Sequence, residues 1–353
     1  MQYKQLGTTG IFVSRLCLGA MTFGASRWHN GDVLGGLDQG QVDALVGKSI
    51  DAGINFFDTA DVYSEGNSER LLGKALAKNR KSVILATKVF GRVGPGVNQV
   101  GTSRVHLLQQ VEASLERLGT DYIDLYQLHQ FDGVTPLEET LRTLNDLVRS
   151  GKVRYIGCSN FAAWQIMKAL GVAAYEHLEK FVTVQAYYSL AGRDLEHEIV
   201  PLINDQKLGL LTWSPLAGGF LSGKYRRGKQ HEVRSRRHVT DFPAVDVERA
   251  YDIIEVLDKI AARRSSASVA QIALSWLLHQ SHVTSVIIGA KAGQQLTDNL
   301  AAADVSLAPE ELSEIDLVSK PRQIYPAWME SLHADRRPGA KSDYAPFMRP
   351  TAL

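Results

Sequence analysis

The sequence contains few of the features that mark secreted or membrane proteins. Its 353 residues include only two cysteines, Cys17 and Cys158, which lie far apart inside apolar runs. Isolated cysteines of this kind are typical of buried, reduced thiols, because disulfide frameworks need even sets at organised spacings. No apolar run near Met1 is typical of a signal peptide, and no stretch of about 18 apolar residues is present to span a bilayer. The sequence therefore predicts a cytoplasmic protein without a membrane segment.

A large excess of charge of one sign is also missing. Lys and Arg number 39 against 38 for Asp and Glu, so no net field favours nucleic acid or a membrane surface. The one strongly basic segment covers residues 226–238, and it has no aromatic side chains between its charges, as single-strand binding would require. We expect no nucleic-acid partner. A loop that closes over phosphate groups and a solvated surface loop both remain open for this segment.

Several kinds of functional site are absent as well. The G-x-G-x-x-G fingerprint of dinucleotide-binding Rossmann folds does not occur. His279 and His282 lack the remaining ligands of a metal site, so we expect no metal. No nucleophile–base pair and no pair of carboxylates lies at the ends of the apolar runs described next. A nicotinamide enzyme with this sequence therefore needs another fold to hold its cofactor.

What the sequence does contain is a regular alternation of short apolar runs and longer amphipathic stretches. Eight runs are strand-like, at residues 16–19, 54–57, 83–88, 123–129, 155–159, 182–185, 210–213 and 283–288. Continuous apolar runs are typical of parallel strands covered on both faces. Helix-period stretches lie between them, as at residues 41–52, 103–118, 137–150, 162–175 and 269–279. The pattern predicts an α/β protein whose residues 1–353 form one (β/α)8 TIM-barrel domain.

Three segments depart from this repeat. Residues 1–13 predict an N-terminal β-hairpin that turns at residues 7–10 and covers the bottom of the barrel. Residues 218–245 predict a long loop on the C-terminal face, and residues 246–264 an extra helix. The chain after Ser319 is rich in Pro, Arg and aromatic residues without periodicity, so we expect an irregular C-terminal tail at residues 331–353.

Four reactive side chains follow the ends of successive predicted strands. Asp58 ends the second run, Lys88 the third and His129 the fourth, and Tyr63 lies in the loop after Asp58. Because the C-terminal ends of barrel strands meet at one rim, we expect these side chains to lie together. Each alone is more often a helix cap, a surface charge or a packing group. Their joint occurrence at successive strand ends favours a catalytic site.

The chemistry available to these side chains is proton transfer. An ammonium near a tyrosine favours the phenolate and lowers the phenol's pKa from its ordinary value of about 10. Lys88 would supply that ammonium, Asp58 would hold Lys88, and His129 would hydrogen-bond the substrate oxygen or the tyrosine. Such a set suits delivery of a proton to an oxygen that becomes an alkoxide as hydride arrives at carbon.

At these residues the sequence resembles the aldo-keto reductase superfamily, and the resemblance covers nearly the whole chain. The segment DTADVY at 58–63, followed by GNSE at 66–69, is similar to the family's second-strand signature. Family proteins carry a catalytic Asp, Tyr, Lys and His in this order. The resemblance therefore implies a catalytic tetrad made of Asp58, Tyr63, Lys88 and His129. The length of the chain and the tail segment YPAWM at 325–329 indicate one of the longer bacterial-type branches.

The resemblance also implies the cofactor NADP(H) and the residues that hold it. GCSNF at 157–161 is similar to the motif that holds the nicotinamide carboxamide, and WSPL at 213–216 to the segment that stacks on the ring. IGAK at 288–291 is similar to the start of the adenine and 2′-phosphate site. Trp213 stands where Tyr is frequent, and Gln295 stands where some relatives have Arg. The implied cofactor residues are Gly19, Met21, Asp58, Ser159, Asn160, Gln185, Trp213, Ser214, Leu216, Gly218, Lys224, Gly289, Lys291, Gln295 and Asn299.

The activity that the resemblance implies is hydride transfer between NADPH and the carbonyl of an aldehyde or ketone, reversibly to the alcohol. Tyr63 would be the general acid/base, and the small-molecule substrate would contact Trp28, Tyr63, Phe90 and His129. One alternative is a non-catalytic NADP(H)-binding regulatory subunit, since channel-associated β subunits resemble the same family. Another is a barrel hydrolase or isomerase with a coincidental tetrad. The complete tetrad favours the reductase, and no pattern defines an oligomeric state.

Overall fold

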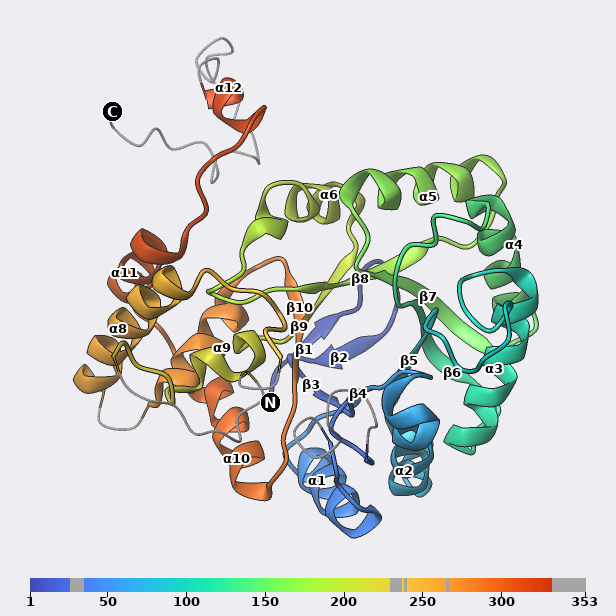
Figure 1. The fold of residues 1–353 in the computed structure, drawn as a ribbon, viewed down its shortest axis with the longest axis horizontal. Helices are drawn as coiled ribbons and strands as arrows, with labels where there is room; N and C mark the ends of the chain where they lie inside the picture. Colours follow the sequence, from blue (N-terminus) through green and yellow to red (C-terminus); the bar gives the residue numbers. More distant parts are fainter. Residues whose placement is uncertain (26–34, 229–236, 238–239, 265–266, 332–353) are drawn as a thin grey trace.

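The centre of the molecule is a closed barrel of eight parallel strands (Figure 1). The computed structural model describes residues 1–25, 35–228, 237, 240–264 and 267–331. The barrel strands are β3 (Leu16–Gly19), β4 (Phe56–Asp58), β5 (Ile84–Val89), β6 (Ile123–Leu128), β7 (Val153–Ser159), β8 (Phe181–Tyr187), β9 (Gly209–Trp213) and β10 (Val283–Ile288). They pair in sequence order, and β10 closes the ring against β3. The predicted barrel is confirmed, with strand ends shifted by one or two residues.

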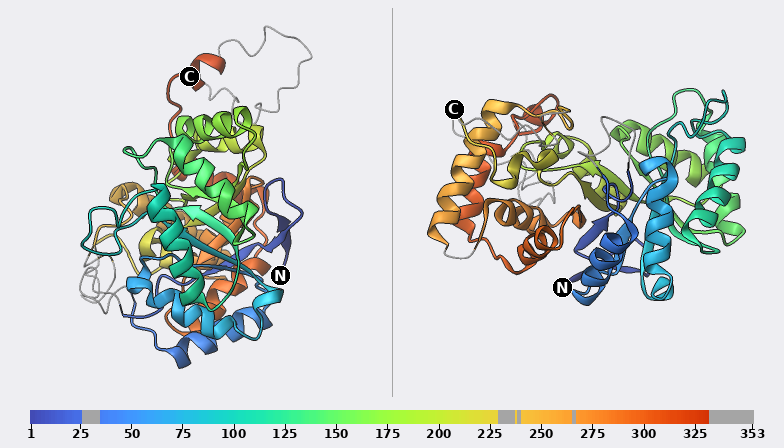
Figure 2. Two further views of the ribbon diagram at one scale, coloured as in Figure 1. Left: turned by 90° about the vertical axis from the view of Figure 1, so that its right-hand side faces the viewer. Right: turned by 60° about the horizontal axis from the view of Figure 1, so that its bottom comes forward.

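The helices form an outer ring around the barrel, as the two further views make clear (Figure 2). After the barrel strands come α1 (Gln39–Asp51), α2 (Asn67–Leu76), α3 (Arg104–Leu118), α4 (Leu137–Arg149), α5 (Ala163–Tyr175), α6 (Ile199–Gln206), α9 (Val269–His279) and α10 (Gly293–Ala301). In α4, Leu137, Leu141 and Leu144 recur at helical spacing and are buried against the strands. This apolar stripe is the reason the segment is a barrel helix rather than a solvent-exposed one.

The N-terminal hairpin closes the bottom of the barrel, as predicted. Its strands β1 (Tyr3–Gln5) and β2 (Phe12–Ser14) are antiparallel, and Leu6 donates its N–H to the carbonyl of Ile11 across the turn. Leu6 and Val13 are fully buried. They pack in one apolar cluster with barrel residues Cys17, Phe56, Ala86, Leu125, Leu211 and Ile287. The lower half of the barrel is therefore a dry, filled core.

Two helices are additional to those that alternate with the barrel strands, and one short helix ends the described chain. α8 (Val247–Arg263) confirms the predicted extra helix, and α11 (Pro309–Ser319) lies along it at the side of the barrel (Figure 1). The chain after Ser319 is not wholly irregular, because α12 (Ala327–Ser331) forms there and stands apart from the barrel (Figures 1 and 2). The predicted irregular tail at 331–353 lies almost entirely outside the described residues.

Both cysteines are buried and unbonded, as the sequence predicts. None of the helices in the described part of the chain combines the length and the apolarity that a membrane span requires.

Candidate active site

The four predicted catalytic side chains lie together at the C-terminal end of the barrel. Asp58 is the last residue of β4, and Lys88 lies on β5 one residue before its end. His129 directly follows β6, and Tyr63 begins a short 3-10 turn after β4, η1 (Tyr63–Gly66). Because β4, β5 and β6 are neighbours in the barrel, their ends bring three of these residues to one place. The sequence-based grouping is thus found in the structure.

Lys88 is the buried centre of this group. Its side chain has no solvent exposure, and its ammonium donates to Asp58 Oδ1 at 2.5 Å, to the carbonyl of Thr59 at 2.8 Å and to Tyr63 Oη at 3.3 Å. Three acceptors match the three N–H groups of an ammonium. Burial by itself lowers the pKa of Lys88, but Asp58 and Tyr63 more than offset this and raise it above 10.5. Lys88 is therefore a charged ammonium at physiological pH.

The second oxygen of Asp58 is held by two amides from across the barrel. Gln127 Nε2 donates to Asp58 Oδ2 at 3.1 Å, and Gln185 Nε2 donates to the same oxygen at 2.8 Å. Gln185 also donates to Gln127 Oε1 at 3.2 Å. All three side chains are buried. Buried polar groups are tolerated when they are paired and hydrogen-bonded, and this network gives both oxygens of Asp58 a partner beneath Lys88.

His129 presents a neutral imidazole to Tyr63. The two ring centroids are 5.7 Å apart and the rings are nearly perpendicular, at 78°. Burial and the nearby Lys88 ammonium lower the pKa of His129 to about 3. At neutral pH its ring nitrogens are therefore one donor and one acceptor. A neutral His at this position suits a hydrogen bond to an uncharged oxygen.

A second network links the ends of β6, β7 and β9. Asn160, just after β7, donates from Nδ2 to the carbonyl of His129 at 2.9 Å and to Ser159 Oγ at 3.1 Å. Its Oδ1 accepts from Trp213 Nε1 at 3.1 Å. Asn160 holds a left-handed backbone conformation, with φ 58°. The residue that the resemblance assigns to the nicotinamide carboxamide therefore also ties Trp213 to the backbone of His129.

Trp213 has two aromatic neighbours at the rim. Phe242 stacks on it, with ring centroids 5.5 Å apart and an interplanar angle of 11°. Tyr187, the last residue of β8, is tilted against it at 5.1 Å and 34°. The indole is thus held by a hydrogen bond at its edge and by ring contacts. Because Phe242 already stacks on one face of this half-buried ring, a planar heterocycle would have to use the other face or take the place of Phe242.

The loop after β9 contains four residues with positive φ: Ser214, Ala217, Gly218 and Gly219. Turns of this kind point successive backbone N–H groups inward and are common at phosphate sites. Here the N–H of Gly218 donates to Ser214 Oγ at 2.9 Å. Leu216 lies in the same loop and is half-buried, while Lys224 further on is exposed. The predicted pyrophosphate residues therefore share one compact loop.

The predicted adenine and 2′-phosphate residues lie in the loop that follows β10 and on α10 itself. Lys291 is exposed, and its backbone N–H donates to Gln295 Oε1 at 2.8 Å. Asn299 Nδ2 donates to the carbonyl of Gly289 at 3.1 Å, so Asn299 shapes the loop that leaves β10. A further cation was missed from the sequence, because the Lys48 ammonium on α1 donates to the carbonyl of Gly293 at 3.1 Å. No local sequence pattern indicates Lys48 as a site residue, because only the folded chain brings its side chain to α10.

Comparison with known proteins agrees with this geometry. Residues 15–320 match the aldo/keto reductase family. The chain belongs to the aldo/keto reductase family. It is 36% identical to the versiconal hemiacetal acetate reductase of Aspergillus parasiticus over 348 residues, covering 92% of this chain and 99% of that protein. It is 37% identical to an uncharacterized oxidoreductase of Bacillus subtilis, covering 88% of this chain and 94% of that protein.

A third relative is named as a channel subunit and not as an enzyme. The chain is 37% identical to a probable voltage-gated potassium channel subunit beta of Oryza sativa subsp. japonica, covering 92% of this chain and 98% of that protein. Membership of the aldo/keto reductase family supports an oxidoreductase that acts on a small molecule, and a nicotinamide cofactor is typical of the family. The channel-subunit relative keeps the regulatory alternative open.

Within this aldo/keto reductase, two of the predicted cofactor residues, at the start of the barrel, occupy different environments. Gly19 ends β3, where a Cβ atom would lie 2.7 Å from Ile287 Cγ2 of β10. Its lack of a side chain is therefore required by strand packing. Met21 is half-buried in the loop that follows. Phe90, predicted to contact substrate, is half-buried just after β5 and Lys88. Trp28, the remaining predicted substrate residue, lies outside the described residues.

The basic segment after β9 is partly neutralised by α8. Arg226 donates to Asp258 at 2.7 Å, and Arg227 contacts Glu248, Asp252 and Glu255. Arg237 pairs with Asp241 and donates to the carbonyl of Pro243 at 2.7 Å. These carboxylates reduce the positive field that nucleic-acid binding would need. In the described part of the chain, no group of three or more His, Cys, Asp or Glu side chains could hold a metal ion.

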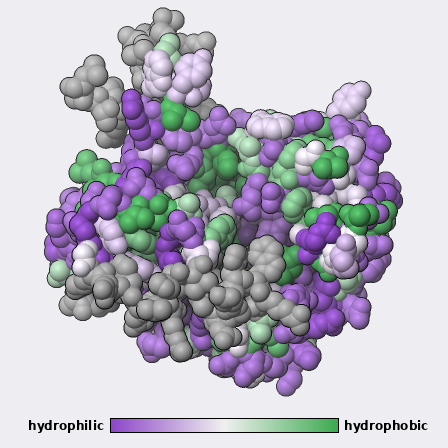
Figure 3. All heavy atoms as spheres, viewed as in Figure 1, coloured by the Kyte–Doolittle hydropathy of each residue, from purple (hydrophilic) through white to green (hydrophobic). Residues whose placement is uncertain are grey.

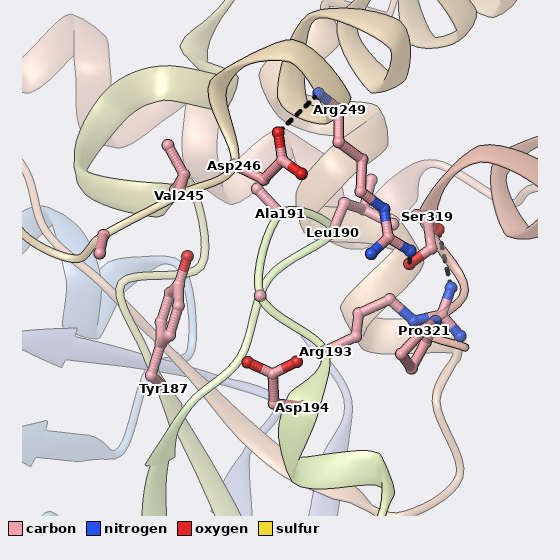
Figure 4. A pocket seen from close by; sticks show the side chains of 12 residues that line it. Tyr187, Leu190, Ala191, Arg193, Asp194, Val245, Asp246, Arg249, Ser319 and Pro321 are labelled. Atoms are coloured by element: carbon pink, nitrogen blue, oxygen red, sulfur yellow. Dashed lines mark hydrogen bonds between the residues drawn. The ribbon is translucent and has the colours of Figure 1, made fainter. Parts of the chain in front are cut away.

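A small cavity adjoins the site behind the end of β8 (Figure 4). It has a volume of about 240 Å³ and lies between the β8–α6 loop, the start of α8 and the chain after α11. Tyr187 lines this cavity and also contacts Trp213. In the space-filling view, the face around the barrel mouth is hollowed near its middle and bordered by both hydrophobic and hydrophilic side chains (Figure 3).

Gln127 is the residue of the buried site that sequence reasoning missed. It lies in a mostly apolar run two residues before His129, and its side chain is fully buried. A polar residue inside a run of a parallel barrel strand was the available signal, since only every second residue points inward. Gln185 was assigned to the cofactor through the resemblance, and the structure adds its hydrogen bond to Asp58.

Proposed function

We propose that this protein is an NADP(H)-dependent reductase that transfers hydride to the carbonyl of an aldehyde or ketone, with Tyr63 as the general acid. The observation that carries the proposal is the contact of Tyr63 Oη with the buried Lys88 ammonium at 3.3 Å. A cation beside a phenol stabilises the phenolate that remains after the proton has left. In the reverse direction the same phenolate accepts the proton of an alcohol.

The residues around Tyr63 have different roles in proton transfer. Asp58, held by Gln127 and Gln185, keeps Lys88 charged and in place. His129, neutral because its pKa is lowered to about 3, can donate a hydrogen bond to the substrate oxygen without competing as a stronger acid. The burial of Lys88 excludes water from one side of Tyr63, which strengthens the electrostatic effect of the ammonium.

The residues that would hold a nicotinamide cofactor fit its shape and charge. Trp213 offers a fixed ring for stacking, the left-handed loop at 214–219 suits a pyrophosphate, and Lys291 before α10 suits a 2′-phosphate. When bound, the reduced cofactor supplies the hydride. Asn160 and Ser159, beside His129, offer polar groups for the carboxamide.

Substitution of Tyr63 tests the proposal. Tyr63→Phe removes the acidic hydroxyl and keeps the ring, so turnover should fall by about 10²-fold or more while NADPH binding is retained. Carbonyl-dependent loss of NADPH absorbance measures turnover, and quenching of tryptophan fluorescence measures binding. Wild-type turnover in the Phe variant would remove Tyr63 from the mechanism.

The cofactor preference has a separate test at Lys291. A charge-assisted hydrogen bond contributes about 1.5–3 kcal/mol, or roughly 10–100-fold in affinity. Lys291→Ala should therefore weaken NADPH by that factor and leave NADH nearly unchanged. Because Gln295 adds no charge, we expect a narrower preference for NADP(H) than in a relative with Arg there. Titration of both cofactors decides this, and equal losses for the two would show that Lys291 does not contact the phosphate.

The second candidate is a cofactor-binding regulatory subunit. The observation that favours it is the 37% identity with a probable potassium channel subunit beta. Such a protein would bind NADPH but act through a partner. A wild-type protein that binds NADPH and reduces no member of a broad panel of aldehydes and ketones would favour this candidate over the reductase.

A further inference from the structure

The turn that carries Tyr63 has an unusual backbone. Ser64 has φ 50° and ψ 39°, Glu65 has φ 58° and ψ 37°, and Gly66 has φ 84°. Three successive residues thus occupy the left-handed region, which side chains other than glycine rarely adopt. Such conformations persist only where the surrounding structure imposes them.

Left-handed residues other than glycine gather at the catalytic face. The described chain has seven: Ser64, Glu65, Asn160, His177, Lys207, Ser214 and Ala217. Five of the seven follow β4, β7 or β9, and three of these five, Ser64, Asn160 and Ser214, also make side-chain hydrogen bonds there. His177 and Lys207 instead lie at the ends of α5 and α6. Backbone strain is therefore concentrated where the active-site loops leave the barrel.

The Ser64 side chain connects this turn to the loop that follows β3. Its hydroxyl lies 2.8 Å from the carbonyl of Phe23 and 3.1 Å from that of Gly24, in the loop after β3, and the side chain is almost fully buried. The two segments are in close contact, because a Cβ atom on Gly24 would lie 3.2 Å from Ser64 Cβ. The hydroxyl therefore fixes a strained turn against a rigid carbonyl edge.

The position of Tyr63 depends on this turn. Of the three contacts of the Lys88 ammonium, the one to Tyr63 Oη is the longest, at 3.3 Å, against 2.5 and 2.8 Å for the others. Lys88 and Asp58 are fixed by the barrel strands, whereas Tyr63 lies on the turn. A displacement of the turn by a fraction of an ångström would separate Tyr63 from the cation, and misplacement by about 1 Å can cost roughly 10²-fold in rate.

We propose that Ser64 is a positioning residue for proton transfer: its hydroxyl holds the left-handed turn so that Tyr63 Oη stays beside Lys88. This inference rests on the proposed function of Tyr63 as the general acid. Ser64 does not touch the reacting atoms. It acts through the backbone of the residue next to it, at a position where glycine would be the less strained choice.

Three substitutions separate positioning from simple support of the fold. Ser64→Gly removes the hydroxyl and relieves the backbone, Ser64→Ala removes the hydroxyl and keeps the strain, and Ser64→Thr keeps the hydroxyl on a β-branched residue that tolerates this region least. We expect kcat to follow the hydroxyl, falling by about 10-fold or more in Gly and Ala and much less in Thr. We expect the melting temperature to follow backbone tolerance, highest for Gly and lowest for Thr.

Other readouts define the effect further. Because none of the predicted cofactor residues is replaced, the dissociation constant of NADPH should stay near wild type in all three variants. The solvent isotope effect on kcat should rise in the Gly and Ala variants as proton transfer becomes slower. Lys207→Gly is the matched control: it relieves the same backbone conformation at the end of α6, and it should raise the melting temperature without changing kcat.

The outcomes decide the question even if the Thr variant does not fold. A Ser64→Gly variant with wild-type kcat, or a kcat that follows melting temperature across the series, would overturn the inference while leaving Tyr63 as the general acid. A wild-type protein without turnover on any carbonyl would overturn both the proposed function and the role of Ser64. A Gly variant that is more stable and slower than wild type is the result expected.

Discussion

The two halves of the barrel interior have opposite chemistry although the same strands build them. The lower half contains Phe56, Ala86, Leu125 and Leu211, packed against the hairpin residues Leu6 and Val13. Two residues further along the same strands stand Asp58, Lys88, Gln127 and Trp213. Since inward-facing positions recur every second residue, these are successive layers of one barrel.

The comparison shows how a barrel can hold a polar site without losing its core. Every polar side chain of the upper layer is tied to another: Asp58 to Lys88, and Gln127 and Gln185 to Asp58. The named side chains of the lower layer need no such pairing, because they are apolar and are covered by the hairpin. The two layers should therefore respond differently to substitution: changes in the upper layer should lower both activity and stability, whereas changes in the lower layer should lower stability alone.

The largest effect is expected for Lys88→Met. The change leaves the Asp58 carboxylate buried without its cation, which should lower the free energy of unfolding by about 3–5 kcal/mol. Turnover should fall by about 10²–10⁴-fold, because Tyr63 loses the ammonium that favours its phenolate. Denaturant unfolding and NADPH oxidation measure the two losses.

A double variant sharpens this result. Asp58→Asn combined with Lys88→Met removes both charges, so it should recover much of the lost stability and none of the turnover. Recovery of turnover would mean that the ion pair only supports the fold. A single Lys88→Met variant as stable as wild type would contradict the view that Asp58 depends on this cation.

A smaller loss of activity, with a comparable loss of stability, is expected one layer below. Leu125→Ala leaves a cavity in the core under the site and should cost about 2–5 kcal/mol in the free energy of unfolding. Turnover per folded molecule should stay near wild type, because the apolar Leu125 side chain makes no hydrogen bond to a candidate catalytic group. If kcat falls as strongly as it does in Lys88→Met, the two layers are not separable and the comparison fails.

The last effect, which develops only below about pH 6.5, concerns the pH dependence of stability. The folded-state pKa of His129 is about 3, well below the value of about 6.5 for an unfolded chain. The unfolded state therefore binds the extra proton between these values, so the stability present above pH 6.5 is lost as the pH falls toward 3. His129→Asn should flatten this part of the curve by up to about 1.4 kcal/mol per pH unit.

His282 provides the matched control for that measurement. Burial first, and then the charges of Lys4 and Arg193, lower its pKa to about 4, so His282→Gln should flatten the curve over pH 6.5 to 4. It lies before β10, away from the strand ends that carry the tetrad. Only the His129 variant should also change turnover. An unchanged acid limb in both variants would show that neither imidazole is held neutral.

Much of the fold followed from the sequence because the pattern was regular. Strands 16–19 and 283–288 were predicted with the bounds that the structure shows, and α9 likewise. The helix at 327–331 was not predicted, because five residues carry too little periodicity to distinguish from a tail. The candidate catalytic residues could be grouped from the sequence because strand ends of a barrel share one rim. Gln127 was overlooked because its partner Asp58 is 69 residues away along the chain.

The motif DTADVY contains two aspartates, Asp58 and Asp61, whose surroundings depend on the tertiary structure. The sequence alone determined that an acidic residue ends β4 and that a tyrosine follows it, since apolar runs and their ends are local properties. It did not determine which carboxylate would be charged. Asp58 accepts hydrogen bonds from Lys88, Gln127 and Gln185, whereas the Asp61 carboxyl oxygens are buried without a hydrogen-bond partner among the described residues.

Those surroundings give the two acids opposite roles. Burial, together with the charge of Glu69, raises the pKa of Asp61 well above its ordinary value, so it favours the neutral acid. Asp58, three residues earlier, faces a buried ammonium that stabilises the carboxylate. The difference comes from β5, β6 and β8, which supply the donors to Asp58 and are distant in the chain. Ionisation depends on those neighbours in space, and only the closed barrel brings them together.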